Sequence, residues 1–325
     1  MKRKIVIMGT RRSGSTFIGK LLTNSSNAFA YVEEPFNPVR GIKNLNHLWY
    51  PYINQGNHHS IVKTDLQKLL DLKSVKFKNS IVNDVTKKSD LNVSRLRVII
   101  EIFKNKSKEP LIKRVLRVFF KSHHQVSYIK ARYSTKKYIV YKDALMSLAI
   151  KEVLRNKNAK VIFIYRNPLG FYYSMKRLNW AISSDHFFNQ NELIKDYPFI
   201  KDLPRITEID KIINEWLIVN TVLFEQAKIN NRILCVPHEK LALDPSGQII
   251  KIFNWLEISE KINFQKINLF TDGKHETSKT KDVKRNSKKE LLSWKGKISE
   301  AEIAHVLRRT QELFEKLNDL SNHQI

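Results

Sequence analysis

Short apolar runs alternate with amphipathic stretches along much of the chain. The run at residues 4–8 (KIVIM) predicts a short buried strand, and two similar runs predict strands over residues 138–141 and 160–165. Between those two, apolar residues at helical spacing predict a helix over residues 144–154. A strand, a helix and a further strand in this order form a βαβ unit, which favours a parallel sheet with helices on both faces.

The second half of the chain continues this rhythm. Apolar positions recur at helical intervals over residues 209–228 and 299–317, and the stretch 244–256 has the polar first residue of a capped helix. A short apolar run at residues 232–236 predicts one more strand. We therefore expect an α/β fold in which a parallel β-sheet is flanked by helices.

A glycine- and serine-rich loop follows the first predicted strand and leads into a helix start at residues 17–22. The loop reads Gly9-Thr10-Arg11-Arg12-Ser13-Gly14-Ser15-Thr16. Successive backbone N–H groups at a helix N-terminus bind anions. The spacing follows the phosphate loop of nucleotide hydrolases, G-x4-G-K-[ST], except that Ser15 occupies the lysine position, with Arg12 and Lys20 as the nearest cations.

A P-loop kinase or nucleotide hydrolase is an alternative interpretation of this loop, and an ordinary glycine-containing turn is another. The missing lysine argues against the nucleotide hydrolase. Such enzymes also need a strand that ends in Asp to hold magnesium. The strand at 160–165 ends at Arg166 instead, and Asp143 follows Lys142, whose charge opposes a cation there. The loop is therefore expected to handle phosphate charge with Arg and Lys, without a metal.

A second anion site is predicted directly after the strand at residues 160–165, where Arg166-Asn167-Pro168 begins. An arginine at the carboxyl end of a parallel strand lies at the edge where α/β proteins bind ligands. Ser174 falls on the helix that follows, and its hydroxyl can donate to the same anion. An arginine with a nearby hydroxyl suits a terminal phosphate.

The segments TRRSGSTF (Thr10–Phe17) and VIFIYRNPLGFYYS (Val161–Ser174) resemble the two donor-binding motifs of sulfotransferases that use 3′-phosphoadenosine 5′-phosphosulfate (PAPS). In that family the first loop holds the 5′-phosphosulfate and the R-x7-S element holds the 3′-phosphate. A weaker resemblance of VKRNSKKELLSWKGKIS to a basic family segment implies that two further residues close over the nucleotide. The donor-binding residues implied are Arg11, Arg12, Ser13, Gly14, Ser15, Thr16, Arg166, Ser174, Lys284 and Arg285.

The resemblance covers roughly residues 1–38 and 138–317. It implies a P-loop NTPase-like sulfotransferase fold in a single domain spanning residues 1–325. Residues 39–137 match nothing recognisable and are expected to form a variable insertion on the acceptor side of this domain.

Sulfuryl transfer to a hydroxyl needs a base for the acceptor proton and positive charge for the developing anion. Glu34 in Glu33-Glu34-Pro35-Phe36 resembles the glutamate that deprotonates the sugar hydroxyl in carbohydrate sulfotransferases. Arg12 and Lys142 are expected to stabilise the anion. The stretch Tyr141-Lys142-Asp143 lacks the histidine of the aryl and alcohol enzymes, which favours the carbohydrate branch. Alternative bases are Glu33, Asp143 and the histidines of two doublets, His58-His59 and His123-His124.

The net charge of the chain limits the classes of binding partner. The 325 residues include 58 Lys+Arg against 31 Asp+Glu, a net charge of +27, much of it in residues 104–137 and 274–297. Such an excess fits nucleic acid, an anionic membrane surface, or anionic small molecules and glycans. Because no base-stacking module accompanies the basic segments, a nucleic-acid-binding protein is the least favoured alternative.

The expected acceptor is a carbohydrate hydroxyl of a glycan or glycolipid, and an anionic or lipid-linked acceptor fits the charge. The basic amphipathic stretch Leu111–Lys121 is compatible with peripheral contact to an anionic membrane. A single cysteine, Cys235, suits a reducing compartment, and no apolar run approaches the length of a membrane span. The expected location is the cytoplasm, with the inner membrane surface as an open alternative.

Overall fold

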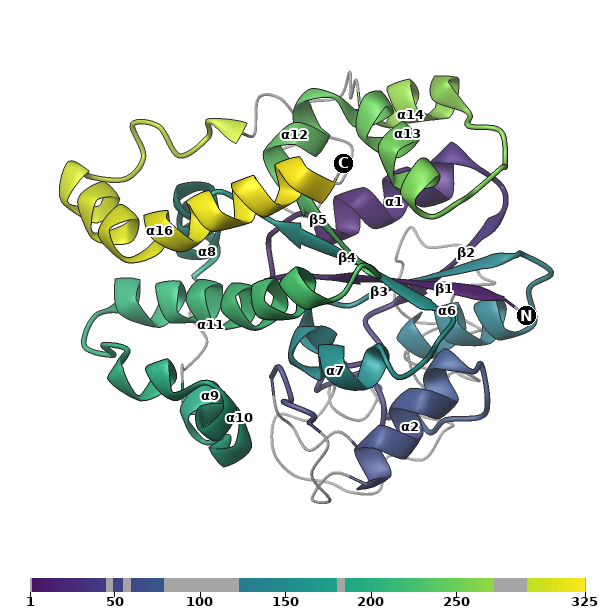
Figure 1. Cartoon of the computed structure of the whole chain (residues 1–325), viewed down its shortest axis with the longest axis horizontal. Helices are drawn as coiled ribbons and strands as arrows, with labels where there is room; N and C mark the ends of the chain where they lie inside the picture. The colour runs from purple at the N-terminus through teal and green to yellow at the C-terminus, as the bar shows by residue number, and fades with distance from the viewer. Residues whose placement is uncertain are drawn as a thin grey trace, which may run out of the picture.

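A computed structural model of the chain describes residues 2–44, 49–54, 60–78, 123–179, 185–271 and 291–324. Within these residues, five parallel strands form one sheet in the order β2-β3-β1-β4-β5, and helices cover both of its faces (Figure 1). The strands are β1 (Arg3–Met8), β2 (Phe29–Glu33), β3 (Tyr138–Lys142), β4 (Ala159–Tyr165) and β5 (Ile233–Pro237). The predicted α/β architecture with a parallel sheet is confirmed.

The sheet separates two hydrophobic cores because successive side chains of a strand point to opposite faces. In β1, Ile5 and Ile7 belong to one core, whereas Val6 and Met8 belong to the other. The first core is covered by α1 (Ser15–Ser25), α12 (His238–Leu243), α13 (Pro245–Trp255) and α14 (Phe264–Thr271). Parallel strands whose two faces are both covered have nearly continuous apolar sequences, and the strands of this sheet show that pattern.

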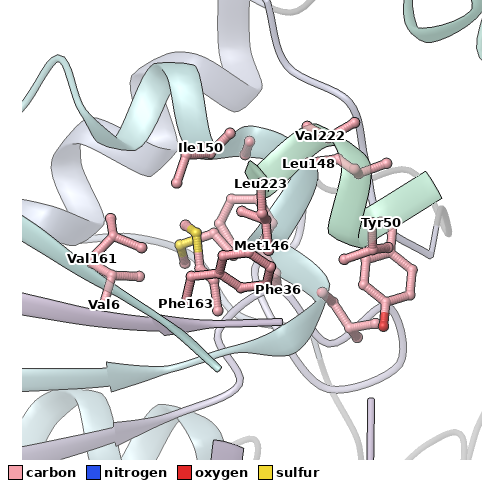
Figure 2. Packing of buried hydrophobic residues seen from close by; sticks show 14 of the residues in the cluster. Val6, Phe36, Tyr50, Met146, Leu148, Ile150, Val161, Phe163, Val222 and Leu223 are labelled. Atoms are coloured by element: carbon pink, nitrogen blue, oxygen red, sulfur yellow. The ribbon is translucent and has the colours of Figure 1, made fainter. Parts of the chain in front are cut away.

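The second core is the larger one. Its principal helices are α2 (Ser60–Leu70), α6 (His123–Arg132), η2 (Ala144–Ala149), α7 (Ile150–Val153), α8 (Pro168–Leu178), α11 (Glu208–Ile229) and α16 (Glu300–Gln324). The short helices α9 (Asp185–Phe188), α10 (Asn191–Asp196) and η3 (Pro198–Asp202) extend from its side (Figure 1). Figure 2 shows how residues from the strands, η2 and α11 pack together there, with Phe36 next to Met146 and the Tyr50 ring at one side of the cluster.

One predicted element differs from the structure, and one strand of the structure was not predicted. The stretch 144–154 is not one α-helix but the 3₁₀ helix η2 followed by the short α7. The Asp143 carboxylate accepts the Leu145 N–H at 2.9 Å, and the Ser147 hydroxyl accepts the Gly9 N–H at 3.0 Å, so the first turn is held tightly against β1. The edge strand β2 was not predicted, although four of its five residues are apolar and Phe29 and Val32 are buried.

Several predictions lie outside the described residues. These are Lys284 and Arg285, the amphipathic stretch Leu111–Lys121, and the His58-His59 pair. The described parts of residues 39–137 belong to the connection between β2 and β3. Of the helices that the structure describes, none combines the length and apolar character needed to cross a membrane.

Candidate active site

The carboxyl ends of the five strands meet at one edge of the sheet. The glycine-rich loop follows β1, Glu34 follows β2, Lys142 ends β3, Arg166 follows β4 and His238 follows β5. Because parallel strands end on the same side, residues from five distant parts of the sequence lie along one edge of the sheet. The topology alone therefore joins the two predicted anion sites and the predicted base.

The loop after β1 is shaped by two left-handed residues. Arg12 has φ +63° and Gly14 has φ +97°, and α1 begins at the next residue, Ser15. The Ser13 N–H donates to the Thr10 carbonyl at 3.3 Å, and the hydroxyls of the same two residues are hydrogen-bonded. The result is a tight turn that ends at the N-terminus of α1, where the first backbone N–H groups have no partner within the helix. Such an arrangement favours an anion.

The second anion site contacts this loop directly. The Arg166 Nη1 donates to the Arg12 carbonyl at 3.2 Å, and the Arg12 Nε donates to the Ser174 Oγ at 3.1 Å. Arg166 is only 8% exposed and Ser174 only 3%. The structure therefore brings together Arg12, Arg166 and Ser174, which the sequence places on two separate motifs. One buried and one half-buried guanidinium group beside a hydroxyl and a helix N-terminus can hold two phosphate-type groups.

The predicted base and its predicted cation form an ion pair. The Lys142 Nζ donates to the Glu34 Oε1, and the Asn37 Nδ2 donates to the Glu34 Oε2 at 3.4 Å. Lys142 is almost fully buried, whereas the Glu34 side chain remains 28% exposed. Burial disfavours the ionised form of Glu34, but Lys142, together with His124 and Asn37, outweighs burial and holds the pKa of Glu34 below its ordinary value. Glu34 is therefore a carboxylate that can accept a proton from a group reaching its exposed side.

Asp143 has a different role from Glu34. It is fully buried, and its two oxygens accept the N–H groups of Phe36 at 2.6 Å and Leu145 at 2.9 Å. Burial and the nearby Glu34 carboxylate raise the pKa of Asp143 to about 7. Because both of its oxygens hold backbone, Asp143 positions the turn that carries Glu34, which itself has the left-handed φ of +40°.

The other alternative bases lie along β2 and α6. His124 is almost fully buried, and its Nδ1 is 2.7 Å from the Glu33 carbonyl. The Glu33 N–H donates to the Ser127 Oγ at 3.1 Å, so α6 is tied to the end of β2 at two points. Of these groups, Glu34 is the one in contact with Lys142.

Arg11 is oriented away from its neighbour Arg12. Its guanidinium forms a two-bond ion pair with Glu215 of α11, and its N–H donates to the Tyr50 Oη at 2.8 Å. The implied donor contact from Arg11 stays a prediction, since these groups are engaged within the protein. Sequence reasoning had no local signal for this, because Glu215 lies far along the chain.

The family of the chain follows from its match to a protein-family profile. Residues 2–320 match the family profile described as a sulfotransferase domain. The chain belongs to the sulfotransferase family. The resemblance inferred from the two anion-binding motifs is thereby confirmed, and with it the sulfotransferase fold.

Solved structures with similar folds are sulfotransferases as well. The domain from the Synechococcus PCC 7002 olefin synthase is 13% identical, with 95% of this chain and 94% of that chain covered and a TM-score of 0.42. The domain from the curacin biosynthetic pathway is 11% identical, with coverage of 96% and 98% and a TM-score of 0.44. Mouse sulfotransferase SULT7A1, complexed with PAP, is 12% identical, with coverage of 100% and 88% and a TM-score of 0.41. The search of curated proteins found no match.

The sulfonate donor of this family is PAPS. The loop before α1 and the pair Arg166 and Ser174 stay the predicted sites of its two phosphate-type groups, and the structure brings these two sites into contact. Within the described part of the chain, no group of three or more His, Cys, Asp or Glu residues is arranged to hold a metal ion.

His238 is a residue of this sulfotransferase site that sequence reasoning missed. A Cβ placed on Gly14 would lie 2.4 Å from the His238 Nδ1, and this buried nitrogen has no hydrogen-bond partner among the described residues. Burial and the nearby Arg166 lower the pKa of His238 to about 3, so the imidazole is neutral. The signal that could have found it is its place directly after a strand, the same topological position as Arg166.

The next residue, Glu239, supports the second motif. Its Oε1 accepts the Asn167 N–H at 3.0 Å, in the turn that presents Arg166. Burial raises the pKa of this carboxyl above its ordinary value. The start of α12 therefore contacts both donor motifs, Gly14 of the loop through His238 and Asn167 through Glu239.

Proposed function

We propose that this sulfotransferase transfers the sulfuryl group of PAPS to a hydroxyl of a carbohydrate acceptor, in a glycan or a glycolipid. The observation that carries the proposal is the ion pair of Glu34 and Lys142 at the ends of two adjacent strands, next to the strand that leads into the loop. A glutamate in this E-P-F placement resembles the base of carbohydrate sulfotransferases.

The donor is held by the residues that the two motifs supply. Backbone N–H groups of residues 14–16 and the Arg12 guanidinium bind the 5′-phosphosulfate, and Arg166 with Ser174 binds the 3′-phosphate. The direct bonds of Arg12 to both of these last residues support this division, because they place the two anion sites next to each other. Lys284 and Arg285 remain predicted contacts outside the described residues.

Glu34 takes the proton of the acceptor hydroxyl, and Lys142 and Arg12 stabilise the negative charge that develops. In the resting ion pair, Lys142 weakens Glu34 as a base because it lowers the pKa of that carboxyl. An anion that attracts Lys142 away from Glu34 raises that pKa toward its ordinary value and strengthens the base. The pair is thus suited to a reaction in which negative charge arrives beside Lys142 and a proton arrives at Glu34.

Basic side chains beside Glu34 support an anionic acceptor. The turn after Glu34 is joined to residues 75–78 by a bridge between Ile42 and Phe77, and the Lys78 Nζ donates to the Pro38 carbonyl at 2.6 Å. Residues 38–44 and 72–78 contain one arginine and four lysines and no acidic residue, and of these lysines Lys73 pairs with Asp71 at 3.9 Å. A cationic surface near the base attracts an acidic glycan or the phosphate of a lipid-linked one.

Donor binding is tested first with 3′-phosphoadenosine 5′-phosphate (PAP) by calorimetry. The wild-type protein is expected to bind PAP much more tightly than adenosine 5′-phosphate, and Arg166→Ala should lose most of that preference because it removes a cation from the 3′-phosphate site. Thermal shifts with ATP and magnesium and with an oligonucleotide serve as comparisons. Stabilisation by ATP and magnesium without stabilisation by PAP would contradict the proposal.

The base is tested by Glu34→Gln, with Glu33→Gln as the competing candidate on the neighbouring residue. Transfer of radiolabelled sulfate from PAPS is measured on a panel of neutral and acidic oligosaccharides and simple phenols. Glu34→Gln should retain PAP affinity and lose turnover by roughly 100- to 10,000-fold, the usual contribution of a general base. If Glu33→Gln loses turnover to this extent and Glu34→Gln does not, Glu33 is the base. If sulfate is transferred to the phenols and to none of the oligosaccharides, the proposal of a carbohydrate acceptor is wrong.

A further inference from the structure

Arg12 adopts a backbone conformation that a non-glycine residue rarely takes. Its φ of +63° lies in the left-handed region, where the side chain crowds the backbone. Such a residue keeps this conformation only when its surroundings hold it there. The bonds on either side of Arg12 therefore decide whether the loop keeps its shape.

On one side, Arg12 is held by the donor motif itself. Its carbonyl accepts the Arg166 Nη1 at 3.2 Å, and its Nε donates to the Ser174 Oγ at 3.1 Å. These groups also face the donor, so they are part of the binding site rather than an independent support.

On the other side, the preceding peptide is held by a buried network. The Arg11 N–H donates to the Tyr50 Oη at 2.8 Å, and the Tyr50 O–H donates to the Glu215 Oε1 at 2.8 Å. Glu215 also receives the Arg11 guanidinium. Tyr50 is completely buried at the side of the second core (Figure 2), and burial together with Glu215 keeps the pKa of its hydroxyl well above the ordinary value, so the proton stays on the oxygen.

Tyr50 does not belong to either donor motif. It lies in the connection between β2 and β3, the part of the chain expected on the acceptor side. Its carbonyl accepts the Gln190 Nε2 at 3.0 Å, and the Gln190 Oε1 accepts the Tyr52 N–H at 2.6 Å. Residues 49–54 are therefore bonded to the donor loop through Tyr50 and to the chain just before α10 through Gln190.

We propose that Tyr50 is a positioning residue for donor binding, which holds the Arg11 peptide and through it the left-handed Arg12, and so couples the acceptor-side segment 49–54 to the donor loop. The inference rests on the loop being the donor site of the proposed function. It assigns Tyr50 no contact with the donor and no part in the chemistry.

The test compares Tyr50→Phe with Tyr52→Phe. Each variant removes one hydroxyl from a buried ring of the same segment, but the Tyr52 hydroxyl bonds to Asp196 and not to the loop. Tyr50→Phe leaves the Arg11 N–H without its buried acceptor and removes one hydrogen bond from Glu215, which keeps the Arg11 guanidinium. It is expected to raise the Kd for PAP and the KM for PAPS about tenfold. Tyr52→Phe should leave both values within about twofold of wild type, although it lowers the melting temperature in the same way.

A PAP Kd in Tyr50→Phe within twofold of wild type would overturn the inference, and so would an equal rise in Tyr52→Phe. Should Tyr50→Phe fail to fold, Glu215→Gln tests the same network from α11 and is expected to weaken PAP binding in the same direction; unchanged binding there overturns the inference. The failure of the proposed function looks different, because wild-type protein would then not prefer PAP over adenosine 5′-phosphate.

Discussion

Replacing Gly14 with alanine should destabilise the protein for two separable reasons. The φ of +97° at Gly14 is a conformation that side chains disfavour, at a cost of about 1–2 kcal/mol. The new Cβ would also lie 2.4 Å from the Nδ1 and 3.0 Å from the Cε1 of His238, a ring that is buried and cannot easily move. Overpacking of this kind costs about 1–3 kcal/mol, so the total loss in the free energy of unfolding is roughly 2–5 kcal/mol.

Gly296 offers a matched control. It also has a left-handed φ, +68°, but a Cβ there would meet no atom within 4 Å. Gly296→Ala is therefore expected to cost about 1 kcal/mol, the backbone contribution alone. Both free energies are measured by urea unfolding of the whole chain, with the slope of the transition checked for constancy. In a His238→Ala background, Gly14→Ala should fall to nearly the cost of Gly296→Ala, because its steric partner has gone.

Equal losses in Gly14→Ala and Gly296→Ala would refute this reasoning, because they would show that His238 does not press on the loop. A full loss for Gly14→Ala that persists in the His238→Ala background would refute it too. PAP binding gives a second measurement on the same variants. Displacement of the loop by the new Cβ should weaken PAP binding in Gly14→Ala but not in Gly296→Ala.

Further predictions concern stability and reactivity. Since the pKa of His238 is lowered to about 3, the unfolded chain binds a proton below pH 6.5 that the native state does not, so this residue makes stability fall as the pH drops. Between pH 7 and pH 5, His238→Phe should lose about 2 kcal/mol less than wild type in urea unfolding. Asp210→Ala removes the carboxylate that accepts the Thr207 N–H in the capping box of α11 and that pairs with Arg309 of α16. It should cost about 3 kcal/mol in thermal unfolding while folded protein keeps its PAP affinity. Burial raises the pKa of Cys235 to about 12, so a thiol reagent should modify it only after denaturant is added.

The parts of the fold that sequence predicted are those with a local signature. The apolar runs of β1, β3, β4 and β5 are continuous because both faces of the sheet are covered, and α11 lies within one residue of its predicted ends. The edge strand β2 was missed although its five residues, FAYVE, are also mostly apolar. Residues 144–154 form a 3₁₀ helix and a short α-helix instead of one α-helix. The Asp143 side chain bonds to the Leu145 N–H and the Ser147 side chain to the Gly9 N–H, and hydrophobic periodicity does not reveal such bonds.

The site divides in the same way. The glycine-rich loop and Arg166 carry their meaning in a few consecutive residues, so both could be placed at strand ends from sequence. Arg11 and Arg12 are adjacent and chemically identical, yet one side chain turns to Glu215 and the other to Ser174. That difference arises from the left-handed φ at Arg12 and from partners more than a hundred residues away. His238 and Tyr50 were missed for the same physical reason.

The position of residues 34–137 between β2 and β3 has a practical consequence for making chimeric enzymes. This crossover begins with Glu34, directly after β2, and ends at β3, whose last residue is Lys142, while the donor loop and Arg166 follow β1 and β4. A crossover grafted from a relative would therefore leave the donor motifs covalently intact. The grafted crossover would nevertheless have to supply a hydroxyl at the position where the Tyr50 Oη accepts the Arg11 N–H. Otherwise the relative's residue at the position of Glu215 would have to be transferred with it.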